Sequence, residues 1–186
     1  MRIVSGILKG KKINYLKNSN TRPLKDSVKE NIFNILKHSK LVKPKIENSS
    51  VLDMYSGIGS FGIECISRGA KKVTFIEQDI NALTILEENL NNLSIYKKSK
   101  IIKGKIEDEI NRINNEKFNF FFFDPPFKDN SFIENLKIIR KKKIFNIENI
   151  IIIHREKKSQ DNLENSMHLI ETKYYGRSKV IFGFFD

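Results

Sequence analysis

The stretch Phe118-Asn119-Phe120-Phe121-Phe122-Phe123-Asp124-Pro125-Pro126-Phe127 predicts a buried strand that ends abruptly in a polar turn. Its aromatic run is too short for a stable helix and is rich in residues that favour strands. The prolines cannot continue the strand, because proline fixes φ and has no N–H to give to a neighbouring strand. We therefore expect the Asp124 side chain and the Pro125 carbonyl to point outward at the carboxyl end of the strand. Open α/β sheets bind their ligands at that edge.

A second strand end of this kind precedes a glycine-rich turn in Val51-Leu52-Asp53-Met54-Tyr55-Ser56-Gly57-Ile58-Gly59-Ser60-Phe61-Gly62. Glycines let a backbone approach a ligand closely. Glu77 closes the next expected strand, and a carboxylate in that position accepts hydrogen bonds from ribose hydroxyls. Polar strand ends at Asp53 and Asp124 within one sheet predict a binding site between them.

Strands and helices alternate along most of the chain. Hydrophobic patterning predicts strands at 51–55, 72–77, 99–104, 118–123, 149–154, 168–175 and 178–185, and helices at 60–69, 79–92, 106–114 and 131–142. This alternation predicts an α/β, Rossmann-like fold with a mostly parallel seven-stranded sheet and helices on both faces. Gly176-Arg177 is short enough for a hairpin, so the last two strands should be antiparallel to each other.

The first 45 residues predict a small N-terminal module, with the α/β domain running over 46–186. Short apolar runs around Gly10 indicate a β-hairpin, and Thr21-Arg22-Pro23 indicates an extended break. The next segment has apolar residues at helical spacing, so a helix should follow. Asp26 or Ser27 is expected to cap it.

The charge balance favours a polyanionic partner. Lys and Arg number 34 against 22 Asp and Glu, a formal net charge of +12, and such an excess attracts nucleic acids. The chain is also rich in Asn, Ile and Phe, a bias that an AT-rich genome produces without selection for charge, so the charge alone carries modest weight. Basic residues beside the expected hairpin favour a phosphate-binding surface, although they also fit solvent-facing strand positions. They are Arg2, Lys9, Lys11 and Lys12.

Composition argues against several other classes. One cysteine excludes an intramolecular disulfide and a cysteine-rich zinc site, and the three histidines show no ligand spacing, so we expect no metal. No apolar stretch approaches the ~20 residues of a membrane span, and the N-terminus does not match a signal peptide. We expect a cytoplasmic monomer without a membrane partner.

The glycine turn matches a nucleotide-binding fingerprint. Gly57-x-Gly59-x-x-Gly62 has the dinucleotide spacing, with Glu77 about 20 residues further on. NAD and S-adenosyl-L-methionine both carry a ribose, so the glycines leave both cofactors open. Asp53 separates them, because a carboxylate there repels a pyrophosphate but suits the cationic sulfonium and ammonium of S-adenosyl-L-methionine. The sequence therefore favours a methyltransferase over an NAD-dependent oxidoreductase.

The cofactor motif and the Asp-Pro-Pro-Phe turn both resemble motifs of known methyltransferases. Residues 53–64, with Arg68-Gly69-Ala70 and Glu77, resemble the cofactor half of class I methyltransferases. Asp124–Phe127 is similar to the signature of enzymes that methylate exocyclic or amide nitrogens. One departure is Lys103-Gly104-Lys105-Ile106, which stands where such enzymes often have a polar Asn or Asp near the adenine. The resemblance then leaves the adenine contact to this backbone or to Glu107.

Two further segments narrow the resemblance. Residues 2–12 and 21–34 resemble the N-terminal module of the RsmD-type 16S rRNA guanine-N2 methyltransferases, and the hairpin at 175–179 is similar as well. The resemblance spans nearly the whole chain. It implies methyl transfer from S-adenosyl-L-methionine to the exocyclic N2 of a guanine in small-subunit ribosomal RNA, either free or within a 30S particle.

The resemblance also implies roles for particular residues. Asp124 and the Pro125 carbonyl would accept the hydrogens of the target amine, and Phe127 would stack on a base taken out of its helix. The implied catalytic residues are Asp124, Pro125, Pro126 and Phe127. The implied cofactor-binding residues are Asp53, Tyr55, Ser56, Gly57, Gly59 and Glu77. Arg22 and Lys29 join the four basic residues above as RNA contacts, although both also fit ordinary surface charges.

Alternative substrates remain open on the sequence. Adenine N6 or cytosine N4 of DNA, or the amide of a protein glutamine, would suit the same turn. The chain lacks a large target-recognition domain, which argues against a restriction-type DNA enzyme. A non-catalytic RNA-binding protein is disfavoured by the intact carboxylates at both strand ends.

Overall fold

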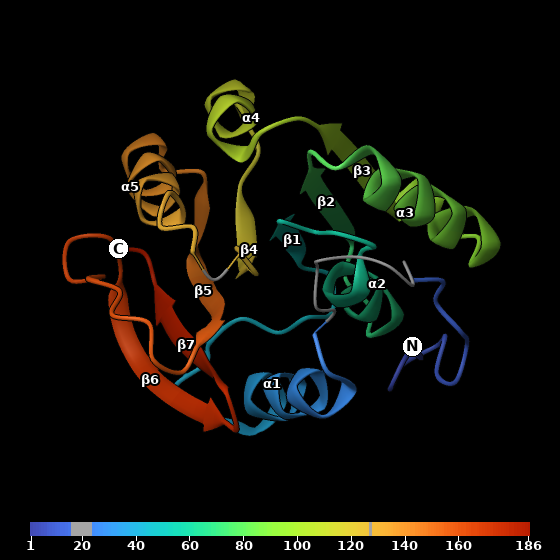
Figure 1. Cartoon of the computed structure of the whole chain (residues 1–186), viewed down its shortest axis with the longest axis horizontal. Helices are drawn as coiled ribbons and strands as arrows, with labels where there is room; N and C mark the ends of the chain where they lie inside the picture. The colour runs from blue at the N-terminus through green and yellow to red at the C-terminus, as the bar shows by residue number, and fades with distance from the viewer. Residues whose placement is uncertain (16–23, 127) are drawn as a thin grey trace.

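The computed structural model describes residues 1–15, 24–126 and 128–186. Its centre is a seven-stranded sheet with the strand order β3-β2-β1-β4-β5-β7-β6 (Figure 1). The strands are β1 Ser50–Met54, β2 Lys72–Glu77, β3 Ser99–Lys103, β4 Phe118–Phe123, β5 Phe145–Glu156, β6 His168–Tyr175 and β7 Ser178–Phe184. The helices are α1 Asp26–His38, α2 Ser60–Ser67, α3 Ile80–Asn92, the short 3-10 helix η1 Tyr96–Lys98, α4 Ile106–Arg112 and α5 Phe132–Lys142. The expected order of elements is confirmed.

The pairing of the strands also agrees with the expectation. β1 to β5 run parallel to one another, whereas β7 is antiparallel to both β5 and β6. β5 is longer than the expected strand at 149–154, because it begins at Phe145. The carboxyl ends of β1, β4 and β5 meet at one edge of the sheet. That edge carries Asp53, Asp124 and the end of β5.

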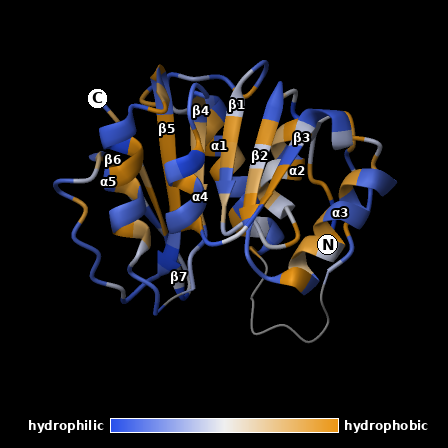
Figure 2. Ribbon diagram, turned by 90° about the horizontal axis from the view of Figure 1, so that it is seen from above, coloured by the Kyte–Doolittle hydropathy of each residue, from blue (hydrophilic) through white to orange (hydrophobic). Residues whose placement is uncertain are grey.

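The strands β1, β2 and β4 and the second half of β5 are buried on both faces, as their near-continuous apolar sequences require. Figure 2 shows the hydrophobic strands between more polar helices, and Figure 1 shows α4 and α5 on one side with α1 and α2 on the other. Alternate strand residues pack into two cores. Val51, Phe122 and Ile152 belong to the core under α1, α2 and α3, whereas Leu52 and Phe123 belong to the core under α4 and α5.

The N-terminal segment packs directly on the first of these cores. Within residues 1–15 the expected hairpin is reduced to one antiparallel bridge between Arg2 and Lys12. Ile3, Leu8 and Ile13 are buried in the same apolar cluster as α1 and α2. Because the two parts of the chain share this cluster, the boundary at residue 45 stays a prediction.

Helix α1 is held by aromatic stacking. Phe61 of α2 stacks between Phe33 of α1 and Phe122 of β4, with ring centroids 5.1 and 4.0 Å away. The expected cap of this helix is wrong, because Lys25 occupies the N-cap position and makes no side-chain cap bond, while Asp26 lies in the first turn. Across the described residues, no helix has both the length and the apolarity that a membrane crossing needs.

Candidate active site

Three polar residues project from the same face at the carboxyl edge of the sheet. Register pairs Met54 with Phe123 and Phe123 with Ile153, so Asp124 and His154 follow directly on neighbouring parallel strands. Side chains alternate along a strand, and Asp53, Asp124 and His154 all fall on the face that carries α1 and α2. Two separate strand ends are therefore brought together, as the sequence predicted for Asp53 and Asp124.

The glycine turn is held by two carboxylates. Glu77 accepts a hydrogen bond from the N–H of Gly57 at 2.7 Å, and Asp53 accepts one from the N–H of Gly62 at 2.9 Å. Gly59 has a φ of 82°, and a Cβ there would lie 2.4 Å from the Leu86 side chain. Only glycine fits that position without moving its neighbours. The turn is thus shaped by groups on β1, β2 and α3 together.

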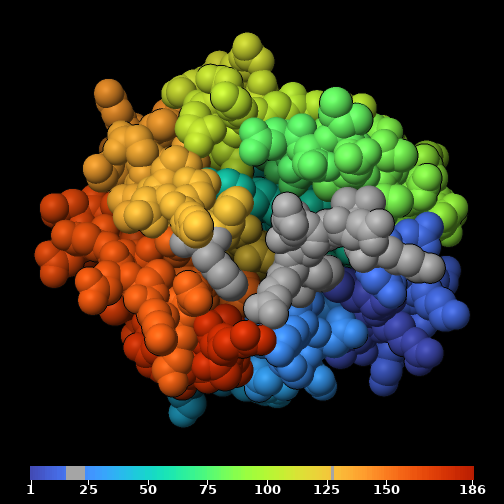
Figure 3. All heavy atoms as spheres, in the orientation of Figure 1, coloured from blue at the N-terminus to red at the C-terminus, as the bar shows by residue number. Residues whose placement is uncertain are grey.

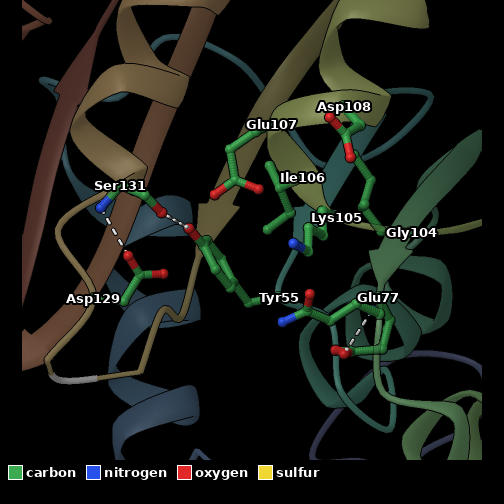
Figure 4. Close-up of a pocket in the computed structure, with 11 residues that line it drawn as sticks. Tyr55, Glu77, Gly104, Lys105, Ile106, Glu107, Asp108, Asp129 and Ser131 are labelled. Atoms are coloured by element: carbon green, nitrogen blue, oxygen red, sulfur yellow. Dashed lines mark hydrogen bonds between the residues drawn. The ribbon is translucent and has the colours of Figure 1, made fainter.

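A cavity of about 500 Å³ lies beside this turn (Figure 4). It is lined by Tyr55, Ile76, Glu77, Gln78, Gly104, Lys105, Ile106, Glu107, Asp108, Asp129 and Ser131. Four of these carry carboxylates and one carries an amine, so the cavity suits a ligand that donates hydrogen bonds. In Figure 3 the same edge of the molecule is hollowed at its centre, with atoms of the β1 and β4 region visible at the floor. Of the predicted cofactor residues, Tyr55 and Glu77 line the cavity; Asp53, Ser56, Gly57 and Gly59 do not.

Tyr55 stands in the middle of the cavity wall (Figure 4). Its hydroxyl lies 3.5 Å from Ser131 Oγ and receives a hydrogen bond from Asn135 Nδ2 at 3.5 Å. Burial raises the pKa of Tyr55 to about 12. Its backbone is left-handed, with a φ of 58°. This uncommon conformation turns the chain from β1 into the glycine turn.

The residues after β3 form the opposite wall. Gly104, Lys105 and Ile106 line the cavity with their neighbour Glu107, whose carboxylate points into it in Figure 4. The segment after β3, which lacks the Asn or Asp often found near the adenine, therefore lies beside the cavity. Glu107 stays the candidate for a polar contact there.

Asp53 and Ser56 have unpaired polar atoms beneath the turn. Asp53 is 1% exposed, and among the described residues neither its Oδ1 nor the Ser56 Oγ has a hydrogen-bond partner. Burial raises the pKa of Asp53 well above its ordinary value, opposed by the Gly62 N–H and reinforced by the carboxylates of Asp124 and Glu77. A buried acceptor without a donor is costly unless a ligand supplies one. A ligand that carries hydrogen-bond donors would supply a partner to such atoms.

Asp124 is paired with a histidine that had no predicted role in the site. His154 Nδ1 and Asp124 Oδ1 lie 2.8 Å apart, with the side chains 11% and 22% exposed. The sequence contains a signal for this pair, because His154 stands one residue past the apolar run of β5, as Asp124 does past that of β4. The strand pairing was needed to use that signal.

The turn after Asp124 is anchored from the other face of β5. Arg155 is 1% exposed and donates to the Pro126 carbonyl at 3.1 Å and to Asn130 Oδ1 at 2.9 Å. Its guanidinium also binds Asp161, whose side chain is equally buried, and lies 4.7 Å from the centre of the Phe132 ring. The Pro126 carbonyl is therefore engaged in holding the turn. Phe127, the last predicted catalytic residue, lies outside the described residues.

The predicted RNA-binding residues differ in how exposed they are in the structure. Arg2, Lys9, Lys11 and Lys12 are all exposed. The structure contradicts the predicted RNA contact of Lys29, because its side chain is 0% exposed. Its Nζ lies 3.2 Å from the Arg2 carbonyl, 3.3 Å from Ser60 Oγ and 3.9 Å from Glu64 Oε2. A buried ammonium cannot touch an RNA phosphate. Arg22 lies outside the described residues.

A mostly parallel seven-stranded sheet with an antiparallel final hairpin, combined with a glycine turn between two acidic strand ends, defines a class I methyltransferase. Proteins of this class take the methyl group from S-adenosyl-L-methionine. The chain belongs to the family whose model is described as Conserved hypothetical protein 95, which matches residues 1–184. This is the RsmD family, so the resemblance noted in the sequence is confirmed.

Individual relatives agree with this assignment. A ribosomal RNA small subunit methyltransferase D of Buchnera aphidicola subsp. Acyrthosiphon pisum is 33% identical over 156 residues, or 84% of this chain and 78% of that protein. The putative methylase HI0767 from Haemophilus influenzae has a TM-score of 0.80 at 28% identity, covering 100% of this chain and 98% of that one. An RNA methyltransferase from Salinibacter ruber, solved with S-adenosyl-L-homocysteine, shares the fold with a TM-score of 0.65 at 11% identity, covering 89% and 95%.

Proposed function

We propose that this protein transfers a methyl group from S-adenosyl-L-methionine to the exocyclic N2 of a guanine in small-subunit ribosomal RNA. The observation that carries the proposal is Asp124, a partly exposed carboxylate at the end of β4, beside the cofactor-type turn of β1. The relatives named as small-subunit rRNA methyltransferases supply the substrate class. We propose further that the protein carries out this role as a monomer in the cytoplasm.

The acidic strand ends support the cofactor assignment. Asp53 Oδ1 and Ser56 Oγ are buried acceptors that have no donor in the described part of the chain, and the other oxygen of Asp53 already accepts from the Gly62 N–H of the glycine turn. They would take the amino end of the cofactor, while Glu77, already against the Gly57 N–H, would meet its ribose. Tyr55 and Glu107 would border the adenine. When bound, the cofactor supplies a methyl group on a cationic sulfur.

Asp124 would prepare the target nitrogen. The lone pair of a guanine amine is delocalised into the ring, which makes the amine a poor nucleophile. Hydrogen bonds from the amine to the Asp124 carboxylate and the Pro125 carbonyl favour a pyramidal nitrogen and aim its lone pair. Asp124 can then take the proton that the nitrogen releases as the new carbon–nitrogen bond forms. Phe127 remains the candidate for stacking on the flipped base.

The N-terminal segment is the proposed RNA contact. Arg2, Lys9, Lys11 and Lys12 are exposed on a segment whose buried apolar residues pack against α1 and α2. Exposed lysines and arginines bind phosphates without reading sequence. We therefore assign these residues to positioning the RNA, and the pocket around Asp124 to selecting the base.

Methyl transfer to defined substrates tests the proposal. Purified small-subunit particles and deproteinised rRNA, both from cells that lack this protein, are incubated with the enzyme and labelled S-adenosyl-L-methionine. We expect label in N2-methylguanine at one position. Label in duplex DNA or in a protein glutamine, with none in either RNA substrate, would replace the proposal with one of the other amino-methyltransferases.

A further inference from the structure

The carboxylate of Asp124 is held by one neighbour on the next strand. His154 Nδ1 lies 2.8 Å from Asp124 Oδ1, and both residues stand one position beyond the paired residues Phe123 and Ile153. Among the described residues, Asp124 Oδ2 accepts no hydrogen bond. One oxygen is thus engaged by His154, and the other is left to accept hydrogen bonds from a ligand.

The chemistry of the two groups assigns the donor. An ionised carboxylate can only accept hydrogen bonds, so the proton between Asp124 and His154 belongs to the imidazole Nδ1. This holds for the neutral Nδ1–H tautomer and for the protonated ring. A charge-assisted hydrogen bond of this kind limits rotation of the carboxylate about its terminal torsion, which is otherwise broad.

The backbone that carries Asp124 is fixed independently of this bond. Arg155 holds the following turn through the Pro126 carbonyl, and β4 pairs with β1 and β5 up to Phe123. A change at His154 should therefore leave the position of the Asp124 Cα unchanged and free only its carboxylate. This separation makes the role of His154 testable without unfolding the site.

We propose that His154 is a positioning residue for methyl transfer: its Nδ1–H fixes Asp124 so that Oδ2 is presented to the target amine. The inference rests on the proposed function, because it takes Asp124 as the group that receives the hydrogens of the amine. His154 itself touches neither the amine nor the methyl group in this scheme. Its contribution is orientation, and orientation errors at a reacting centre lower rates strongly.

Two substitutions distinguish the effect of the hydrogen-bond donor from the effect of side-chain volume at position 154. His154→Asn keeps an N–H close to the position of Nδ1, whereas His154→Leu keeps similar bulk and has no donor. His168 supplies a matched control, because its Nε2 lies 2.8 Å from Asp186 Oδ2 in an exposed pair at the opposite edge of the sheet. His168→Leu removes a histidine–aspartate bond of the same length away from the site.

The measurements are single-turnover methyl transfer to rRNA, KM for the RNA, and cofactor affinity by calorimetry. We expect His154→Leu to lower the transfer rate about tenfold to a hundredfold, with cofactor affinity and KM within about twofold of wild type. His154→Asn should recover most of the rate, and His168→Leu should match wild type. In an Asp124→Ala background, His154→Leu should cause no further loss, since the two residues act as a unit.

Two results overturn the inference while leaving the proposed function intact. One is a wild-type transfer rate in a folded His154→Leu protein. The other is a loss of rate by His154→Leu that adds in full to that of Asp124→Ala. If the wild-type protein methylates neither RNA substrate, the proposed function fails and this inference fails with it.

Discussion

Lys29 and Glu64 form a fully buried ion pair, with Nζ 3.9 Å from Oε2 and both side chains 0% exposed. Glu64 also accepts hydrogen bonds from the N–H groups of Val4 and Ser5 at 2.8 and 2.9 Å, and from Arg68 Nε at 2.8 Å. The Lys29 ammonium in turn donates to the Arg2 carbonyl. The N-terminal segment is therefore attached to α1 and α2 through buried charges, beneath the exposed residues proposed to meet RNA.

Removing one partner of this pair should destabilise the protein. Lys29→Met removes one of the two cations that pair with the buried Glu64 carboxylate, and Arg68 keeps the other. The cost should therefore lie at or below the lower end of the about 3–5 kcal/mol that is typical when a buried ion pair loses one partner. Denaturant unfolding measures the change in stability. Lys37→Met, an exposed lysine on the same helix, is the control and should change stability little. A Lys29→Met protein of normal stability that binds RNA poorly would restore Lys29 as an RNA contact.

Asp124→Ala should lower turnover far more than cofactor affinity. The carboxylate is used as the amine becomes nucleophilic, so its removal acts mainly on the transition state. A decrease on the order of 10²-fold is expected for one contact of this kind. Methyl-transfer kinetics and calorimetry measure the two effects separately. Asp186→Ala, at the other edge of the sheet, serves as the control, and near-normal transfer by Asp124→Ala would leave Asp124 as no more than a strand end.

Glu77→Ala should weaken binding of S-adenosyl-L-methionine. Its carboxylate holds the Gly57 N–H and is the proposed ribose contact, and hydrogen bonds to a charged group contribute about 1.5–3 kcal/mol each. Calorimetry should therefore show at least a tenfold weaker Kd, with no binding of NAD by either protein. Glu87→Ala, whose carboxylate pairs with Lys103 instead, is the control. NAD binding by the wild type without a signal for S-adenosyl-L-methionine would contradict the cofactor assignment.

Asp53→Asn should change how stability depends on pH. Burial holds the pKa of Asp53 well above its ordinary value of about 3.9 in the folded protein. The stability that this carboxyl contributes is present below that ordinary value and is lost as pH rises through the raised pKa. The asparagine does not titrate, so the Tm of Asp53→Asn minus that of wild type should increase from pH 4 to pH 8. Parallel Tm curves would show that the carboxyl titrates normally.

Neutralising the N-terminal basic residues should flatten the salt dependence of RNA binding. Arg2, Lys9, Lys11 and Lys12 are replaced together by serine, and the slope of log K against log salt should fall by about 0.7–0.9 for each phosphate that is no longer neutralised. Cofactor affinity and the methylated position should not change. The control replaces Lys97, Lys98, Lys117 and Lys141, exposed residues near the amino ends of the strands. If both replacements flattened the salt dependence equally, net charge would explain the effect and the N-terminal RNA contact would not.

Much of the fold follows from local patterns in the chain. The aromatic run before Asp124 is strand-forming and buried, and Pro125 and Pro126 end it wherever the strand lies. The glycine turn after β1 and the alternation of strands with helices likewise depend on residues close in sequence. For this reason the sheet, its helices and the positions of Asp53, Glu77 and Asp124 at strand ends could all be predicted.

The contacts that complete the site depend on residues far apart in sequence. His154 meets Asp124 only because β5 pairs with β4 in one register, and a shift of one residue would turn it to the other face. Lys29 is an ordinary helical lysine until α1 packs on α2 and buries it against Glu64. Local patterns determine which residues form strands, helices and turns, because backbone preferences and periodicity act over a few residues. Register and helix packing decide which side chains pair, because those contacts arise only when distant segments are assembled.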